Sequence, residues 1–138
     1  MAQTRPQKDL LLILAREFAS KLATPMVVLD ADGSLAYFNE PAEEVLGRRF
    51  AEAQEVAPED WTAHFQMEDL EGAPLPLQEM PAGVALLERR PAHRVFRITG
   101  LDGVRRVVSV TAFPLFSSRE ALVGVVAIFW AQGEGPTE

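Results

Sequence analysis

Cysteine is absent from the 138-residue chain. Its absence excludes disulfide bonds, thiolate metal ligands, cysteine nucleophiles and the covalent attachment of a chromophore to a cysteine. Long hydrophobic runs are also lacking, since "LLLILA" (Leu10–Ala15) near the N-terminus is far shorter than the roughly 20 residues of a membrane helix. We therefore expect a cytoplasmic protein that does not enter a membrane.

Positive charge is scarce as well. The chain has 13 lysines and arginines against 20 acidic residues, which gives a net charge of −7. This balance argues against nucleic-acid binding, which needs a basic face to displace counterions. Acidic residues dominate between Glu40 and Glu71, and arginines between Arg89 and Arg106. These blocks are either solvated faces or two complementary ends that steer a partner or a second copy of the chain.

Residues 8–22 ("KDLLLILAREFASKL") are predicted to form an amphipathic helix. Apolar residues at three- and four-residue spacing form one stripe: Leu10, Leu11, Leu14, Phe18 and Leu22. Leu12 and Ile13 fall partly off this stripe, so the apolar surface is wider than packing against one sheet requires. The additional apolar surface indicates that the helix packs against a second partner besides the sheet.

The stretch "MVVLDADGSLAYFNEPAEEVLG" predicts a hairpin followed at once by a helix. Strands 26–30 and 34–38 flank Asp32-Gly33, a pair that favours the positive φ of a tight turn. Asn39 is expected to cap the helix, and Gly47 lies near its end.

Short helical segments are expected near "PEDWTAHF" and at 78–89 in the middle of the chain. Three alternating segments then follow, at 94–99, 104–113 and 121–130, separated by turns. This order predicts an α+β domain with one antiparallel sheet. The final strand, "ALVGVVAIFW", has almost no polar residue and must be covered on both faces, for which the N-terminal helix is available.

Three ordered segments resemble the PAS sensory domains. These are "MVVLDADGSLAYFNEPAEEVLG", "DLEGAPLPLQEMPAG" and "GLDGVRRVVSVTAFPLFSSREALVGVVAIFW". The resemblance implies a five-stranded antiparallel sheet with short helices over one face, enclosing a pocket, and the apolar last strand places the N-terminal helix on the other face. It divides the chain into an N-terminal helix (1–23), a PAS domain (24–131) and a flexible tail (132–138).

Strand alternation, taken with the family's usual inward positions, gives the candidate pocket residues. They are Val27, Leu29, Phe96, Ile98, Val108, Val110, Ala112, Val125, Ala127 and Phe129. Trp61 and His64 are candidates from the helical side, with Gln66 and Gln78 as further polar handles. The sheet positions carry no hydroxyl, amide or charge, so this side predicts either a packed core or an apolar ligand.

The opposite face of the sheet would carry Met26, Val28, Val107, Ser109, Thr111, Phe113, Val126, Ile128 and Trp130. It is too apolar to face water. With the helix stripe it predicts a homodimer interface made by Leu10, Leu11, Leu14, Phe18, Val126, Ile128 and Trp130.

PAS relatives bind flavin, haem, coumarate or other small metabolites. The resemblance therefore makes these molecules candidate cofactors of the present chain. A flavin bound through a cysteine adduct is excluded. Haem is not favoured, because His93 and His64 are isolated histidines and such residues are more often surface or capping groups. "DADG" (Asp30–Gly33) lacks the further oxygen ligands of a calcium loop, so no metal site is predicted.

No nucleophile and base occur in a catalytic pattern, so we do not expect an enzyme. The resemblance implies a signalling module that binds a small, apolar ligand, mediates dimerisation, or does both. The alternative is a ligand-free adaptor acting in trans on a histidine kinase or a transcription regulator. Longer relatives leave the last strand through a coiled coil, which "IFWAQGEGPTE" does not resemble, so the chain either signals in trans or belongs to a longer protein.

Overall fold

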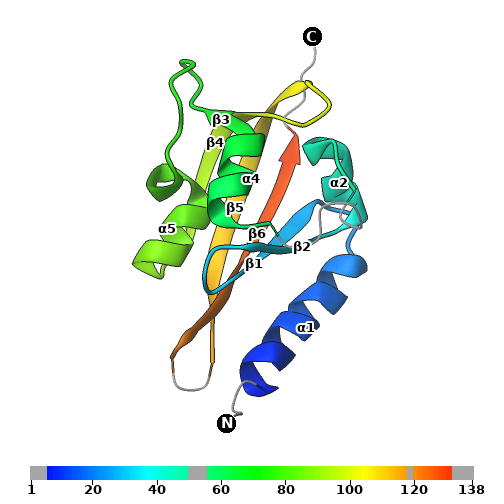
Figure 1. Cartoon of the computed structure of the whole chain (residues 1–138), viewed down its shortest axis with the longest axis vertical. Coiled ribbons are helices and arrows are strands. Elements are labelled where there is room, and N and C mark those ends of the chain that lie inside the picture. Colours follow the sequence, from blue (N-terminus) through cyan, green and yellow to red (C-terminus); the bar gives the residue numbers. More distant parts are fainter. Residues whose placement is uncertain (1–5, 50–55, 118–119, 132–138) are drawn as a thin grey trace.

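The structure of the chain is a computed structural model that describes residues 6–49, 56–117 and 120–131. Its elements in chain order are α1 (Pro6–Ser20), β1 (Met26–Asp30), β2 (Leu35–Phe38), α2 (Glu40–Leu46), α4 (Pro58–His64), β3 (Gln66–Glu68), the 3-10 helix η1 (Leu77–Glu79), α5 (Pro81–Glu88), β4 (Ala92–Thr99), β5 (Arg105–Phe116) and β6 (Leu122–Ala131). The strands form one antiparallel sheet in the order β2-β1-β6-β5-β4-β3 (Figure 1). The predicted α+β fold is confirmed.

The β1–β2 hairpin forms where the sequence predicts it. The Asp30 carboxylate accepts hydrogen bonds from the backbone N–H groups of Asp32 at 2.9 Å and Ser34 at 3.1 Å. Gly33 has a φ of 87°, a conformation that glycine adopts without strain. The turn therefore follows from the Asp-Ala-Asp-Gly sequence itself.

Asn39 begins α2 and is the chain's single asparagine. Its side-chain oxygen accepts a hydrogen bond from the N–H of Ala42 at 3.1 Å, as an N-cap does. Pro41 occupies the first turn, and Gly47 ends the helix with a φ of 73°. The predicted cap is confirmed.

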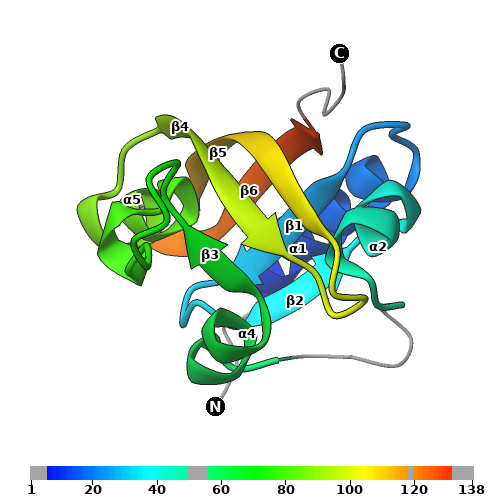
Figure 2. The same cartoon turned by 90° about the horizontal axis from the view of Figure 1, so that it is seen from above.

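The sheet separates two apolar clusters. The larger lies between its inner face and the helices α2, α4 and α5, and includes Phe96, Val108 and Phe129. The smaller lies under α1 on the outer face, around Met26 and Val126. Figures 1 and 2 show α1 against the β1–β2 end of the sheet and α5 beside β4 and β5.

The face of α1 that contacts the sheet is formed by Leu12, Ala15 and Ala19. Leu12 lies over Gly124 of β6, where a Cβ atom would be 3.0 Å from its Cδ2 atom. A strand glycine thus gives the helix its close approach. The contact face is made by small residues and by Leu12, which sequence analysis placed partly off the apolar stripe.

The sheet has six strands, not the predicted five, because β3 pairs with β4. Three residues are too few to show alternation in the sequence. A turn supports them, in which the Asp69 carboxylate accepts hydrogen bonds from the N–H groups of Glu71 and Ala73, each at 2.9 Å. Residues 78–89, expected to be one helix, are split at Met80 into η1 and α5. The predicted tail, 132–138, lies outside the described residues.

Candidate functional site

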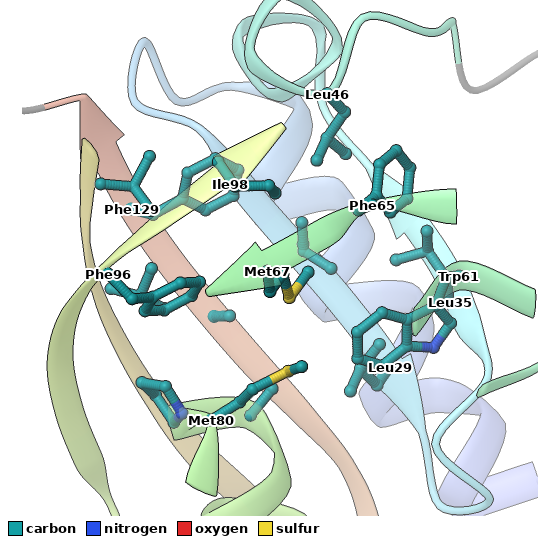
Figure 3. Close-up of a pocket in the computed structure, with 16 residues that line it drawn as sticks. Leu29, Leu35, Leu46, Trp61, Phe65, Met67, Met80, Phe96, Ile98 and Phe129 are labelled. Carbon is teal, nitrogen blue, oxygen red and sulfur yellow. The ribbon is translucent and has the colours of Figure 1, made fainter. Parts of the chain in front are cut away.

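A cavity of about 80 Å³ lies between the inner face of the sheet and the helical side of the domain (Figure 3). Its lining consists of Val27, Leu29, Leu35, Leu46, Trp61, Phe65, Met67, Met80, Pro81, Ala82, Phe96, Ile98, Val108, Val110, Ala127 and Phe129. Every one of these side chains is apolar except for the indole nitrogen of Trp61. The cavity thus exposes carbon and sulfur to any molecule inside it.

The structure brings most of the predicted pocket residues together at this cavity. Those that line it are Val27, Leu29, Trp61, Phe96, Ile98, Val108, Val110, Ala127 and Phe129. Ala112 and Val125 belong to the same buried cluster without reaching the cavity. His64 is exposed at the end of α4, and the next residue, Phe65, takes the inward position.

Sequence reasoning missed the cavity walls that come from the helices and from the two edge strands of the sheet, β2 and β3. The additional lining residues are Leu35, Leu46, Phe65, Met67, Met80, Pro81 and Ala82. Phe65 and Met67 lie two positions apart, just before β3 and within it, and the strand is too short for this spacing to assign a face from the sequence. The others come from the ends of short elements, where no periodic pattern is long enough to assign a face.

The single polar group among the lining side chains, the Trp61 indole N–H, already has a hydrogen-bond partner within the protein. The Trp61 indole N–H donates to the Gly33 carbonyl oxygen at 2.9 Å, so the ring is fixed to the β1–β2 turn. Gln66 and Gln78, the predicted polar handles, are exposed and do not line the cavity. Among the described residues, a molecule in the cavity would therefore find no side chain free to form a hydrogen bond.

Flavin and haem do not fit this cavity. Sites for molecules of that size commonly enclose roughly 300–1,000 Å³ and offer several placed polar groups. A volume of about 80 Å³ without such groups meets neither requirement. A cysteinyl flavin adduct is impossible in addition, because the chain has no cysteine.

Both histidines lie away from the cavity. His93, on β4, places its Nε2 atom 2.8 Å from the Oγ atom of Ser109, which lies on the outer face and is buried. Among the described residues, no group of three His, Asp or Glu side chains is arranged to hold a metal ion. The described part of the chain also contains no helix that is long and apolar enough to cross a membrane.

The outward face of α1 is the second apolar feature. Its side chains remain about half exposed: Leu10 at 52%, Leu14 at 53% and Phe18 at 57%. Leu11 is half-buried. We call Leu10, Ile13, Leu14 and Phe18 the α1 outer face.

The sheet residues predicted for the same interface divide into two groups. Val126 is 2% exposed beneath α1, so a partner cannot reach it unless the helix moves. Ile128 is half-buried, and Trp130 is exposed near the end of β6.

One acidic side chain on α1 has a shifted pKa. The Lys21 ammonium donates a hydrogen bond to Glu17 at 2.7 Å and lowers the pKa of that carboxyl. The pair lies in water beside the α1 outer face. It fixes local charge without contributing much to stability.

Comparison with known proteins supports the fold assignment. The family described as PAS fold matches residues 20–132. No curated protein matches the chain. Among solved structures, the PAS domain of Bordetella pertussis BvgS has 20% identity and a TM-score of 0.60, covering 90% of this chain and 87% of that one.

Two light-sensing domains are also similar. The LOV protein of Rhodobacter sphaeroides has 13% identity and a TM-score of 0.69, with 89% of this chain and 68% of that chain covered. The LOV domain of a blue-light activated histidine kinase from Erythrobacter litoralis has 16% identity and a TM-score of 0.63, with 83% and 100% covered. At these identities the likeness concerns the fold. With the family match over most of its length, the chain belongs to the PAS fold family of sensory and signalling domains, which are typically not catalytic.

Proposed function

We propose that this domain senses a small, uncharged, apolar molecule that binds in the internal cavity. The observation that carries this proposal is the combination of an 80 Å³ space with a lining whose one polar hydrogen, on Trp61, is already bonded. Water in such a space would lose hydrogen bonds, whereas an apolar molecule would lose none. The volume is about half that of the roughly 150 Å³ cavity that accepts benzene in another protein, which limits the ligand to a few heavy atoms.

Xenon is the simplest probe for this cavity, because it is apolar and makes no hydrogen bonds. The protein would be labelled with 13C at the methionine methyl groups and titrated with xenon. Met67 and Met80 line the cavity, so their methyl signals should shift and approach saturation. If they do not respond, the cavity does not bind apolar molecules and the proposal fails.

A matched pair of variants on α5 tests the location. Ala82 and Val84 are both half-buried, but only Ala82 lines the cavity. The larger side chain of Ala82→Leu should weaken xenon binding by about tenfold or more, whereas Val84→Leu should leave it unchanged. Equal effects of the two substitutions would place the xenon elsewhere.

The α1 outer face favours a second function, pairing with another copy of the chain. Four apolar side chains on one helix remain exposed after α1 has packed on the sheet. Such a face is self-complementary across a two-fold axis, because it is uncharged and each copy presents the same residues. A histidine kinase or a transcription regulator acting in trans is the competing occupant, and the domain would then be an adaptor.

Analytical ultracentrifugation distinguishes these occupants. The unmodified protein should form a dimer whose population rises with concentration. Phe18→Glu should give a folded monomer, whereas Leu87→Glu, at a similarly exposed apolar residue of α5, should leave the dimer intact. A monomeric unmodified protein, or a dimer that survives Phe18→Glu, would contradict pairing through α1.

A further inference from the structure

A groove of about 500 Å³ lies outside the cavity, between α4, β3 and residues 74–77. Met67 and Met80 line both the groove and the cavity. These two side chains therefore lie between the apolar cavity and the groove. In Figure 3 they come from different parts of the chain, Met67 from β3 and Met80 from the position just before α5.

The two residues that the cavity and the groove share both have flexible side chains. Methionine is unbranched, has several rotatable bonds and repacks more easily than a branched or aromatic residue. The backbone on either side is fixed, because Leu75 donates its N–H to the Met67 carbonyl oxygen at 2.9 Å and Val84 donates to that of Met80 at 2.8 Å. The side chains can change rotamer without a change in the fold.

The groove has the polar groups that the cavity lacks. The Gln66 amide is exposed on β3, and the Thr62 hydroxyl donates to the Pro58 carbonyl oxygen at 2.7 Å, so its own oxygen can still accept a hydrogen bond. Glu68 is the charged member of the lining, and Arg105 balances it at 3.0 Å. This arrangement suits an uncharged group that donates and accepts hydrogen bonds.

We infer that the cavity and the groove form one site for an elongated, uncharged amphipathic molecule. Its short alkyl end would pass between Met67 and Met80 into the cavity, and its hydroxyl or amide end would remain in the groove near Gln66. The inference rests on the proposed function of the cavity and extends it from a small apolar ligand to one with a polar end outside.

Straight-chain alcohols from 1-butanol to 1-octanol are suitable probes. Titrated into the methyl-labelled protein, they should shift the Met67 and Met80 signals, and bound alcohol should displace xenon. Gln66→Trp should weaken 1-octanol binding by about tenfold or more without a comparable loss of xenon binding. Gln78 is the matched control, since it is also an exposed glutamine but lies outside the groove, and Gln78→Trp should change neither affinity.

The outcomes separate this inference from the proposal on which it rests. If xenon binds but the alcohols do not bind, or bind without displacing it, the single-site inference is wrong and the cavity remains a site for apolar molecules. Alcohol binding that is insensitive to Gln66→Trp also overturns it. If xenon does not bind, the proposed function fails first.

Discussion

Replacing Asn39 should destabilise the domain more than replacing any exposed polar residue. The side chain is 1% exposed and makes four hydrogen bonds. Its oxygen accepts from the N–H groups of Met26 at 3.0 Å and Ala42 at 3.1 Å. Its amide donates to the carbonyl oxygens of Ala19 and Thr24, each at 2.9 Å. One side chain therefore joins the end of α1, the start of β1 and the start of α2.

The expected cost follows from these bonds. Asn39→Ala removes the N-cap, which is worth about 1 kcal/mol. It also removes the side-chain partner of the Met26 N–H and of the Thr24 carbonyl oxygen, and each such loss costs about 1–3 kcal/mol. The Ala19 carbonyl oxygen, by contrast, still accepts from the Leu22 N–H at 3.1 Å. Allowing for partial relaxation, the free energy of unfolding should fall by about 3–5 kcal/mol, which corresponds to a drop in Tm of roughly 10–15 °C.

Asn39→Asp adds a test in which the loss of stability should change with pH in one direction. The introduced carboxyl keeps the two acceptor bonds but faces the carbonyl oxygens of Ala19 and Thr24 with a negative charge. Burial and these carbonyls should raise its folded-state pKa above the unfolded value. A group with a raised pKa favours the fold while protonated and loses this contribution as the pH rises through the folded pKa. The loss of stability should therefore be larger at pH 7 than at pH 4.

Urea unfolding followed by circular dichroism measures both variants, with Gln78→Ala as the control. Gln78 is an exposed amide, so its removal should change the free energy of unfolding by less than about 0.5 kcal/mol. The reasoning would be refuted by a cost below about 1 kcal/mol for Asn39→Ala. An Asn39→Asp penalty that is the same at both pH values would also refute it.

Three further predictions concern single contacts. Gly124→Val should lower the Tm and detach α1, because a Cβ atom there would lie 2.3 Å from the Leu29 carbonyl oxygen of β1 and 3.0 Å from the Leu12 side chain of α1; limited proteolysis of α1 would show the detachment. Gly83→Ala, a change that usually favours a helix, should instead cost about 2–4 kcal/mol in urea unfolding, because the new Cβ would collide with the Leu77 carbonyl. The Glu17 carboxyl should titrate below its ordinary range by NMR and return to it in Lys21→Met, since the shift comes from that ammonium group.

The parts of the fold that could be predicted from sequence are those with strong local signals. The Asp30–Gly33 turn and the Asn39 cap depend on side chains that bond to nearby backbone, so a few residues determine them. The inward positions of β4, β5 and β6 follow from alternation along strands of eight to twelve residues. These strands supply most of the sheet side of the cavity.

Contacts between distant segments decided the rest. The contact face of α1 depends on Gly124, which is more than 100 positions away and admits Leu12 to the sheet. β3 is too short to alternate and is held by its pairing with β4. Met80 reaches the cavity because the chain turns between η1 and α5. Neither the helical nor the strand periodicity of the sequence assigns a face to a residue at such a turn.

β1 contacts the cavity with one face and α1 with the other, so a change in the cavity can be transmitted to α1 through this strand. Val27 and Leu29 face the cavity, whereas Met26 and Val28 alternate with them and lie under α1. A ligand that displaces the inward pair must shift the same backbone that carries the outward pair. In the methyl-labelled protein, the Met26 signal should therefore move with xenon at the same apparent Kd as the cavity methionines.

The cavity-filling substitution Ala82→Leu decides whether the Met26 response is transmitted. If it passes through β1, Ala82→Leu should abolish it together with the responses of the cavity methionines, because occupation of the cavity is its cause. A Met26 shift that persists in Ala82→Leu would mean that xenon binds directly beside α1. A Met26 signal that stays still while the cavity fills would mean that β1 does not couple the two faces. Only a response at Met26 that depends on the cavity lets ligand binding bias the pairing of the α1 outer face.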